Sequence, residues 1–361
     1  FSELLASYDA ELSFAKRSYT MCPDTTISIG TKMGEDFVYE GGLLPIVAFL
    51  PGLHIQCGES GSSSNKCILH GGQEQIMSLA TTDLLEELLD LLPLMMPNLE
   101  DYPKDLPDGF EVDSSGLIIE GMTFNRFKEL SKEDGGDGMS HSPLNLLSPG
   151  LGMTVRDCIF QNGNIKNPAS SAIGIHFDDK LWSGKSFYTQ VAIKDCVFQE
   201  NTFHGAIIDS VYGVVDQSLV NAVSHIEVEG CNFIDNVASS VMGLQGTEGT
   251  IEDSCITNTV VDSTTSSIEG GSLISTIDSP SFECKNIFER GTKYVKDPEC
   301  KSVAAHDQVV SSDSNSELSI KLAACEEFDN SIIYKSSQVC AAKKQNKPNN
   351  NSKKKKKGKQ G

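Results

Sequence analysis

The chain has 361 residues, of which 39% are hydrophobic and 22% charged, and its formal net charge is −21 at pH 7. Residues 343–361 hold nine lysines and no acidic residue, so the preceding part carries 20 basic and 50 acidic residues, a net charge of −30. A body this acidic repels nucleic acid and anionic polysaccharide at long range. No apolar run approaches the roughly 20 residues of a membrane span, so no membrane-spanning segment is expected.

The first 17 residues predict an N-terminal helical cap. Leu5, Tyr8 and Leu12 would share one face of a helix over residues 2–15. Such a helix can cover the open apolar end and the strand edges of a stacked-strand fold. The chain begins with Phe1 rather than Met, which we interpret as a processed or partial chain whose signal peptide has been removed or is missing.

Residues 18–79 predict the first strands, which are less regular than those that follow. Cys57 and Cys67 flank the Gly- and Ser-rich loop 58–66. In an oxidising compartment these two cysteines are candidates for a disulfide that closes the loop, whereas in a reducing compartment they would stay free.

An insertion over residues 80–110 is predicted to contain an amphipathic helix. Thr82 can cap its start, Pro93 stops it, and the leucines between them form one broad face. Packing of that face on the side of the fold and docking into the groove of a partner both remain open.

A repeated segment dominates the middle of the chain. Four stretches superimpose without gaps, and their final phenylalanines are 36, 38 and 35 residues apart. The stretches are Leu117–Phe124, Met153–Phe160, Val191–Phe198 and Ile226–Phe233. A fixed period in this range indicates a repeat architecture in which each repeat packs on its neighbours.

Within each repeat the apolar residues first alternate with a period of two, as in a strand, and then slip by one residue. The slip predicts a sharp corner between two short strands. The corner residues are Gly121, Asp157, Asp195 and Gly230. Gly, and to a lesser extent Asp, tolerates the left-handed backbone that a sharp corner needs.

A polar run and a third apolar piece follow each phenylalanine, as in residues 205–208 and 240–244. Three short strands per repeat predict one coil of a right-handed parallel β-helix, an all-β solenoid whose coils stack about 4.8 Å apart. Equivalent residues then pile up inside: the phenylalanines, and beside them Cys158, Cys196 and Cys231. These cysteines are predicted to be small buried residues, with a disulfide between adjacent coils as the alternative.

The predicted domain scheme is therefore a helical cap over 1–17 and a parallel β-helix over 18–290, with insertions at 80–110 and 131–150. An irregular C-terminal cap over 291–342 and a disordered lysine-rich tail over 343–361 complete it. The 131–150 insertion is expected to be a solvated loop.

Several motifs resemble those of the pectin-lyase-like right-handed parallel β-helix superfamily. Phe198–Asn201 with Gly205–Ile207, and Phe233–Asn236, are similar to its Phe-x-x-Asn and Gly-Ala-Ile repeats. The N-terminal third also resembles uncharacterised secreted β-helix proteins of diatoms and related algae, through Ser18–Pro23, His54–Gly58 and Gly61–Gly72. The resemblance covers roughly residues 15–290 and implies the fold, but it carries no established activity.

The residues just before the corners would form an outward-facing ladder. Its members are Glu120, Arg156, Lys194 and Glu229. The structural interpretation is cross-strand ion pairing. The catalytic interpretation is a polysaccharide lyase, in which Asp157 and Asp195 would bind calcium and Arg156 or Lys194 would act as the base. Since both aspartates already serve as corner residues, the structural interpretation is preferred, and no metal site is expected outside the lyase case.

A glycoside hydrolase would need acids that converge on one face. Asp178 and Asp179, near His176, are the one candidate pair of this kind in the sequence.

A run of five lysines near the end of the tail is the candidate contact for a polyanion. The run consists of Lys353, Lys354, Lys355, Lys356 and Lys357. In a secreted protein such a run would bind acidic glycans, whereas in an intracellular protein it would be a targeting signal. A solvated tail that keeps the acidic body soluble is the third interpretation.

These observations predict a non-catalytic, secreted or surface-exposed protein with a binding or structural role, located outside the cell or at its surface. We expect an acidic glycan or the extracellular matrix to be bound through the tail lysines or the insertion loops, without a cofactor. The first alternative is a polysaccharide lyase or glycoside hydrolase of the same superfamily, with calcium only for the lyase. The second is an intracellular scaffold with a basic targeting tail.

Overall fold

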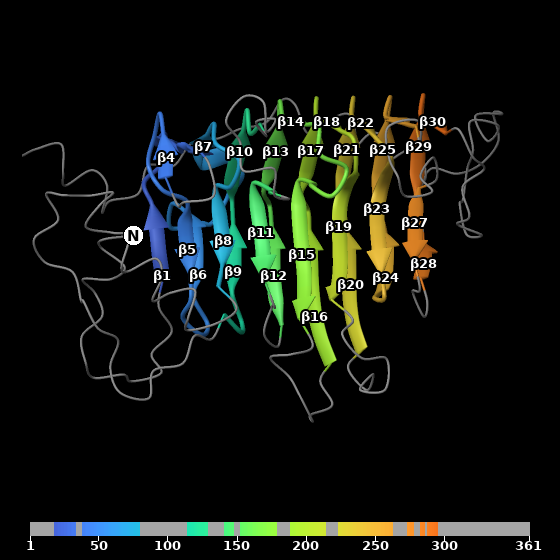
Figure 1. Cartoon of the computed structure of the whole chain (residues 1–361), viewed down its shortest axis with the longest axis horizontal. Helices are drawn as coiled ribbons and strands as arrows, with labels where there is room; N and C mark the ends of the chain where they lie inside the picture. The colour runs from blue at the N-terminus through green and yellow to red at the C-terminus, as the bar shows by residue number, and fades with distance from the viewer. Residues whose placement is uncertain are drawn as a thin grey trace, which may run out of the picture.

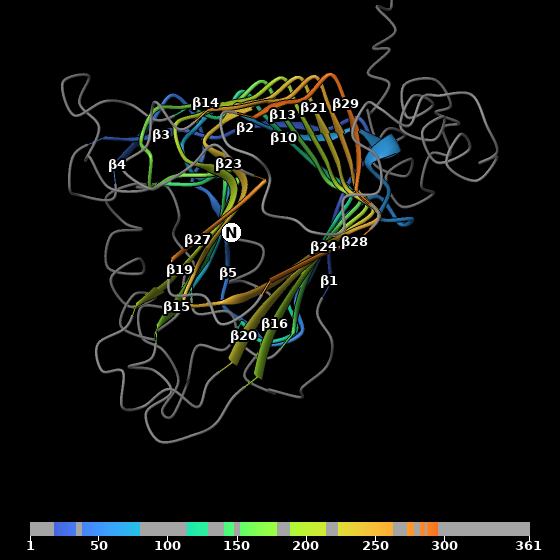
Figure 2. The ribbon, with the colours of Figure 1, turned by 90° about the vertical axis from the view of Figure 1, so that its right-hand side faces the viewer.

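A computed structural model defines the fold over a large part of the chain and shows it to be nearly all β, as predicted. The strands stack side by side along the long axis (Figure 1), and successive coils superimpose when viewed along that axis (Figure 2). The described residues are 18–33, 38–79, 114–128, 141–147, 152–178, 188–213, 223–262, 273–277, 282–285 and 287–294. The predicted helices at 1–17 and within 80–110 lie outside them, as do the tail and most of the predicted C-terminal cap.

Two eight-stranded parallel sheets contain the two strands that flank each predicted corner. The first sheet has the order β1 (Ser18–Met21), β6 (His54–Cys57), β9 (Ile118–Glu120), β12 (Met153–Arg156), β16 (Tyr188–Lys194), β20 (Val223–Glu229), β24 (Glu248–Glu252), β28 (Phe282–Lys285). The second has the order β2 (Thr26–Ser28), β7 (Cys67–His70), β10 (Met122–Asn125), β13 (Ile159–Gln161), β17 (Val197–Gln199), β21 (Asn232–Ile234), β25 (Cys255–Thr257), β29 (Phe288–Arg290).

The third parallel sheet closes each coil and faces the viewer in Figure 1. It contains β5 (Ile46–Ala48), β8 (Ile76–Ser78), β11 (Leu144–Leu147), β15 (Ile173–Asp178), β19 (Ala206–Gly213), β23 (Ser240–Gln245) and β27 (Ile274–Ile277). Each sheet takes one strand from each successive coil, an arrangement typical of a β-helix or solenoid. A small antiparallel pair, β3 (Thr31–Met33) and β4 (Val38–Glu40), and one 3₁₀ helix, η1 (Ser63–Asn65), complete the described elements.

The prediction of three strands per coil is incomplete. A fourth, five-stranded parallel sheet lies in the polar run after each phenylalanine. Its strands are β14 (Asn164–Ile165), β18 (Thr202–Phe203), β22 (Val237–Ala238), β26 (Val260–Val261) and β30 (Lys293–Tyr294). The predicted 131–150 loop likewise contains β11, which pairs with β8 and β15. These strands are short because they lie between turns, so alternation over a single repeat does not reveal them.

The predicted phenylalanine stack is confirmed. Phe124, Phe160, Phe198 and Phe233 are fully buried. Their rings are parallel, with centroids 4.4, 4.9 and 4.9 Å apart along the stack. Cys158, Cys196 and Cys231 are buried and free beside them, so the alternative of a disulfide between coils is wrong. The Cys196 thiol, for example, lies 3.3 Å from the carbonyl oxygen of Lys194 and can donate to it.

All four predicted corners have a left-handed backbone. The φ angles of Gly121, Asp157, Asp195 and Gly230 are 71°, 48°, 53° and 64°. A Cβ on Gly121 would lie only 2.5 Å from the carbonyl oxygen of Gly61, so that corner also has no room for a side chain. A second, unpredicted set of left-handed residues follows the phenylalanines. It includes Asn162, Glu200 and Asp235, with φ angles of 57°, 55° and 52°.

Buried asparagines hold this second turn in place. The Nδ2 of Asn201 donates to Phe160 O at 2.9 Å and to Asn236 Oδ1 at 3.0 Å, so that the side chains link successive coils. Gly163 replaces asparagine at this position in one repeat, because an ideal Cβ there would lie 1.9 Å from the ring of Phe127. No described helix is long and apolar enough to cross a membrane.

Candidate functional site

The predicted charge ladder lies on the outer face of the first sheet. The strands place Glu120, Arg156, Lys194 and Glu229 in one register, each beside the next. Arg156 Nε lies 2.7 Å from Glu120 Oε1, and Lys194 Nζ lies 2.5 Å from Glu229 Oε2. The ladder is therefore resolved into two ion pairs between adjacent coils.

His54 also joins the ladder, although the repeat did not predict it. Its Nε2 lies 2.9 Å from Glu120 Oε2, so the two oxygens of this carboxylate have partners from different coils. The Glu120 side chain is only 13% exposed, and a buried carboxylate is stable only when it is paired in this way. His54 precedes the regular repeats, and its place became visible only through the pairing of β6 with β9.

The electrostatics of the two basic residues oppose a role as a catalytic base. The hydrogen bond to Glu120 raises the pKa of Arg156. The hydrogen bond to Glu229, together with the charge of Glu227, raises the pKa of Lys194. A general base must lose its proton near the working pH. Both side chains are held in the protonated form instead.

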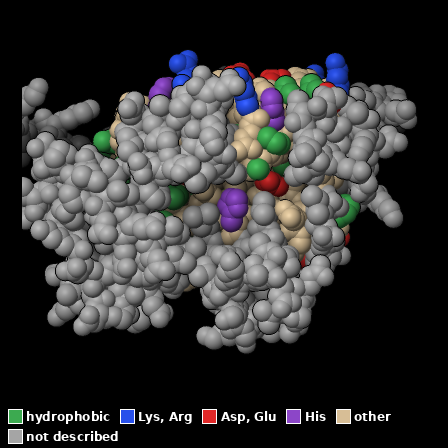
Figure 3. Space-filling view, viewed as in Figure 1, with side chains coloured by type: hydrophobic (Ala, Val, Ile, Leu, Met, Phe, Trp, Pro, Cys, Tyr) green, Lys and Arg blue, Asp and Glu red, His purple; other side chains and the backbone are tan. Residues whose placement is uncertain are grey.

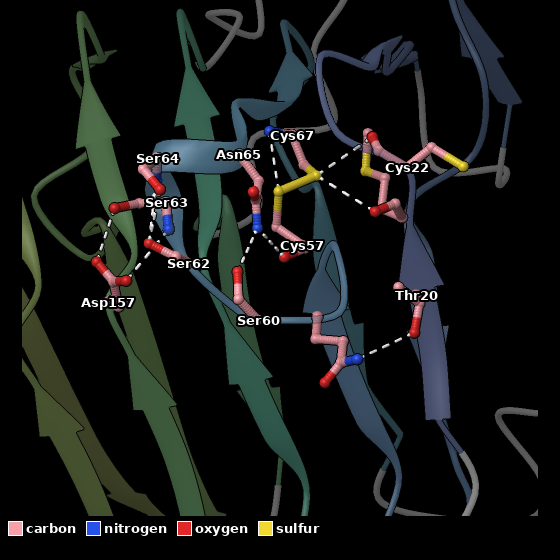
Figure 4. Close-up of a disulfide and its surroundings, with 12 residues drawn as sticks. Thr20, Cys22, Cys57, Ser60, Ser62, Ser63, Ser64, Asn65, Cys67 and Asp157 are labelled. Carbon is pink, nitrogen blue, oxygen red and sulfur yellow. Dashed lines mark hydrogen bonds between the residues drawn. A yellow bond between two sulfur atoms is a disulfide. The ribbon is translucent and has the colours of Figure 1, made fainter. Parts of the chain in front are cut away.

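Asp157 anchors a neighbouring loop. Its carboxylate accepts from Ser63 Oγ at 2.7 Å and from Ser63 N at 3.2 Å (Figure 4). That loop is closed by the disulfide between Cys57 and Cys67, whose Cα atoms are 5.6 Å apart. Inside it, Asn65 Nδ2 donates to Cys57 O at 2.8 Å. Asp157 thus has two structural roles: it forms the left-handed corner and it holds the loop through Ser63.

Asp195 occupies the equivalent corner one coil later. An ideal Cβ on Gly230 would lie 2.6 Å from Asp195 Oδ1, so the carboxylate rests in the space that this glycine leaves. Burial raises the pKa of Asp195, and the charges of Glu229 and Asp157 raise it further.

Three carboxylates of the same face come close together. Oxygens of Glu227, Glu229 and Glu252 lie within 4.8 Å of one another. The ammonium of Lys194 already lies 3.5 Å from Glu227 Oε2 and 2.5 Å from Glu229 Oε2. A cation of the protein itself therefore neutralises part of this group.

The predicted polyanion contact in the tail lies outside the described part of the chain. This applies to all five candidates, Lys353, Lys354, Lys355, Lys356 and Lys357. Their role in binding stays a prediction.

A second polar cluster lies on the outer face of the third sheet and was not predicted. The Oε1 of Glu74 lies 3.1 Å from His141 Nδ1 and accepts a hydrogen bond from Asn145 Nδ2 at 3.0 Å. The three residues are contributed by the coils of β8 and β11, and each is at least nine-tenths buried. Gln73, next to Glu74, is 2% exposed.

His176 and Asp209 extend this cluster over the next two coils. Asp209 pairs in register with Gly174 on one side and Gly243 on the other. An ideal Cβ on Gly174 would lie 3.4 Å from His176 Nε2, and one on Gly243 would lie 2.3 Å from Asp209 Oδ1. Gly243 thus makes room for the Asp209 carboxylate above the sheet, whereas a side chain at Gly174 would only contact the imidazole of His176.

Burial sets the protonation of both groups. It lowers the pKa of His176, against the opposing charge of Glu74, and it raises the pKa of Asp209 to about 7. Perturbed groups of this kind are common in functional sites. Of the acids predicted beside His176, Asp179 and the side chain of Asp178 lie outside the described part. The sequence signal that could have led to this cluster is the polar run Gln73–Glu74–Gln75 directly before a buried strand.

Comparisons with protein-family models, with curated proteins and with solved structures find no match to this chain. The function therefore has to be inferred from the geometry of the two faces.

Proposed function

We propose that this chain is a secreted or surface-exposed right-handed parallel β-helix, of the pectin-lyase-like kind, which binds glycan or matrix and performs no lyase chemistry at its charge ladder. The observation that carries the proposal is that both basic ladder residues are ion-paired, Arg156 with Glu120 and Lys194 with Glu229 and Glu227. The raised pKa values of Arg156 and Lys194 point the same way.

The hand of the coil follows from a general rule. Connections between parallel strands of one sheet are right-handed in about 98% of cases, because twisted strands favour that crossover. Each coil of this chain makes such connections between neighbouring strands of the first sheet, for example from β12 to β16. Together with the Phe-x-x-Asn repeats, this supports the pectin-lyase-like assignment.

Cysteine usage supports an extracellular location. Cys57 and Cys67 form a disulfide, and Cys22, Cys255 and Cys284 are disulfide-bonded as well. Disulfides persist in oxidising compartments and are rare in the cytosol. This favours the extracellular proposal over an intracellular scaffold.

A hydrolase on the third sheet is the alternative that the geometry tests. The pKa of about 7 would suit Asp209 as a general acid. However, Ile76, which follows Glu74 closely, is three coils from Ile208 beside Asp209. Three coil steps correspond to about 14 Å, whereas the two acids of a glycoside hydrolase are about 5–9.5 Å apart. These two acids do not form such a pair.

The charge distribution suggests how a polyanion would be bound. Nine lysines in residues 343–361 follow a body of net charge −30, so attraction to an acidic glycan has to come from the tail. Exposed charges are screened by salt, which makes this attraction weak at physiological ionic strength.

Two assays test the proposal on the purified full chain. Incubation with pectate or alginate, with and without calcium, is expected to release no unsaturated or reducing ends. Turnover that disappears in Arg156→Ala or Asp195→Ala would replace the binding function with a lyase. In the second assay, immobilised alginate should retain the full chain at low salt and release it near physiological salt. A chain that ends at Ala342 should not be retained; equal retention of both would place an anion site on the folded body.

A further inference from the structure

The cluster on the third sheet contains polar groups for which the described part of the chain provides no partner. Among the described residues, neither amide atom of Gln73 has a hydrogen-bond partner, and Asn145 Oδ1 and Gln75 Oε1 have none. Gln73 and Asn145 are 2% and 5% exposed, so bulk water does not satisfy them. An unsatisfied buried polar atom costs about 1–3 kcal/mol, and such atoms in a native protein require an explanation.

The position of Asn145 indicates where the missing partner would lie. Its Nδ2 is fixed on Glu74 Oε1 at 3.0 Å, which identifies Oδ1 as the unpartnered acceptor. His141 Nδ1 lies 3.1 Å from the same Glu74 oxygen. The carboxylate, the amide and the imidazole are therefore held against one another before any ligand arrives. A partner for Asn145 Oδ1 has to be a donor.

The chemistry of these groups selects a ligand class. Asn145 Oδ1 needs a donor, while Gln73 offers an acceptor and two donors, so a ligand that meets both residues must donate and accept. Hydroxyl groups do both. The Glu74 carboxylate and the acidic body disfavour an anion. The described carboxylates and histidines that approach closely enough to share a metal ion are on the other face, at Glu227, Glu229 and Glu252. A neutral, hydroxyl-rich group fits best.

The outer edge of the cluster is less covered than its interior. His176 and Asp209, on β15 and β19, are only partly buried. Gly243 leaves the space that the Asp209 carboxylate occupies, and Gly174 leaves space beside Ser142, since a Cβ there would lie 2.7 Å from Ser142 Oγ. Figure 3, which looks onto this face, shows a histidine and an acidic side chain exposed near its middle. Polar groups thus continue from the buried cluster to the surface.

We propose that the outer face of the third sheet, from β8 to β19, holds a binding site for a neutral sugar unit of a glycan. In this site Gln73 and Asn145 hydrogen-bond the sugar hydroxyls, and Glu74 and His141 hold Asn145 in position. The choice of a glycan as ligand rests on the proposed function, whereas the location and the neutral class rest on the unpartnered groups.

The test is isothermal titration calorimetry of the full chain with cellohexaose, laminarihexaose and mannohexaose, and with hexagalacturonate as the acidic probe, at physiological salt to screen the tail. Two variants remove the unpartnered groups, Gln73→Met and Asn145→Leu. Gln190→Leu is the matched control, because Gln190 Nε2 donates to Glu227 Oε2 at 3.0 Å on the opposite face much as Asn145 donates to Glu74. Thermal unfolding is measured for every variant.

We expect at least one neutral hexasaccharide to bind, and both site variants to weaken that binding about tenfold or more. Gln73→Met should leave the melting temperature unchanged or raise it, since it removes an unsatisfied amide. Gln190→Leu should bind as the unmodified chain does. Equal binding by the site variants and the unmodified chain would overturn this site but leave the glycan-binding function intact. Binding of hexagalacturonate alone would overturn the neutral class. If no glycan is bound at physiological salt, this site fails, and the proposed function then depends on the low-salt alginate assay of the tail.

Discussion

The outer faces of the first and third sheets differ in how the polar and charged residues of neighbouring coils are paired. Parallel stacking places equivalent residues of successive coils side by side, so every charged position meets its own counterpart a few ångströms away. On the first sheet two acidic and two basic residues form opposite-charge pairs between neighbouring coils, Glu120 with Arg156 and Lys194 with Glu229. On the third sheet Glu74 contacts His141 and Asn145, but among the described residues Asn145 Oδ1 and the Gln73 amide have no hydrogen-bond partner.

This difference separates charges that stabilise the fold from groups that are available for a ligand. The ladder residues are already paired with one another and are therefore not available to a ligand, although their residue types in the sequence are those of a lyase site. A cluster that is buried, oriented and incomplete costs stability in the free protein. Such a cost persists where the groups have a use, which is why we place the ligand on the third sheet and not on the ladder.

The largest expected effect concerns the core that both faces share. Phe198 is fully buried between Phe160 and Phe233, so Phe198→Ala should lower the free energy of unfolding by about 3–5 kcal/mol through the cavity it leaves. Urea unfolding followed by circular dichroism measures this. Because both faces rest on one core, a single transition is expected. Two separate transitions, or a loss below about 1 kcal/mol, would show that the faces are not built on one stack.

The second prediction distinguishes the faces by pH. The pKa of Asp209 is raised to about 7, whereas an unfolded Asp titrates near 4. Between these values the folded state holds a proton that the unfolded state has lost, so Asp209 lowers stability progressively as pH rises from about 4 to 7. Asp209→Asn removes this effect. The variant should match the unmodified chain near pH 4 and exceed it by about 2–4 kcal/mol at pH 8.

Urea unfolding of both proteins at the two pH values checks this prediction. His176, the other titrating group near Asp209, is present in both proteins, so its contribution cancels in the difference. A variant that is no more stable than the unmodified chain at pH 8 would show that Asp209 is ionised and solvated, and that the third-sheet face resembles the ladder after all.

The sequence was sufficient for the features that one repeat contains. The phase slip before Phe160, Phe198 and Phe233 located the corners, and the ladder followed from the residue before each corner. The second left-handed turn was missed because asparagines of adjacent coils hold it, as Asn201 and Asn236 do, and a single repeat does not show that contact. The two-residue strands of the fourth sheet were missed for the same reason.

The third-sheet cluster could not be predicted from the sequence, for a different physical reason. Glu74, His141 and Asn145 are brought together only by the pairing of β8 with β11. A stretch of 65 residues separates Ser78 from Leu144, and its length hides the register between the two strands. Gln73 and Asn145 became informative only once burial was known, because an unpartnered amide has meaning only where water is excluded.

The third prediction concerns the contribution of the Glu120 carboxylate to stability. Glu120 is 13% exposed and bound to both His54 and Arg156, so Glu120→Gln should lower the free energy of unfolding by about 1–2 kcal/mol. The glutamine can still accept from Arg156, which limits the loss. The change is measured by urea unfolding at pH 7. A more stable variant would mean that the cost of burying this carboxylate exceeds its pairing energy and that the ladder is not a stabilising element.

The smallest expected effect completes the comparison. Lys194 and Glu229 are 34% and 39% exposed, and ion pairs at this exposure contribute about 0–1 kcal/mol. Lys194→Met keeps the apolar stem of the side chain and removes the ammonium, so the unfolding free energy should fall by no more than about 1 kcal/mol. The loss should shrink further in 1 M salt, where exposed charges are screened.

Removal of Lys194 also leaves Glu227, Glu229 and Glu252 without the cation between them, so the variant, unlike the unmodified chain, should gain thermal stability from millimolar calcium. Calcium stabilisation of both proteins to the same degree would show that the lysine does not neutralise this group, and the ladder face would then be open to a ligand like the third sheet.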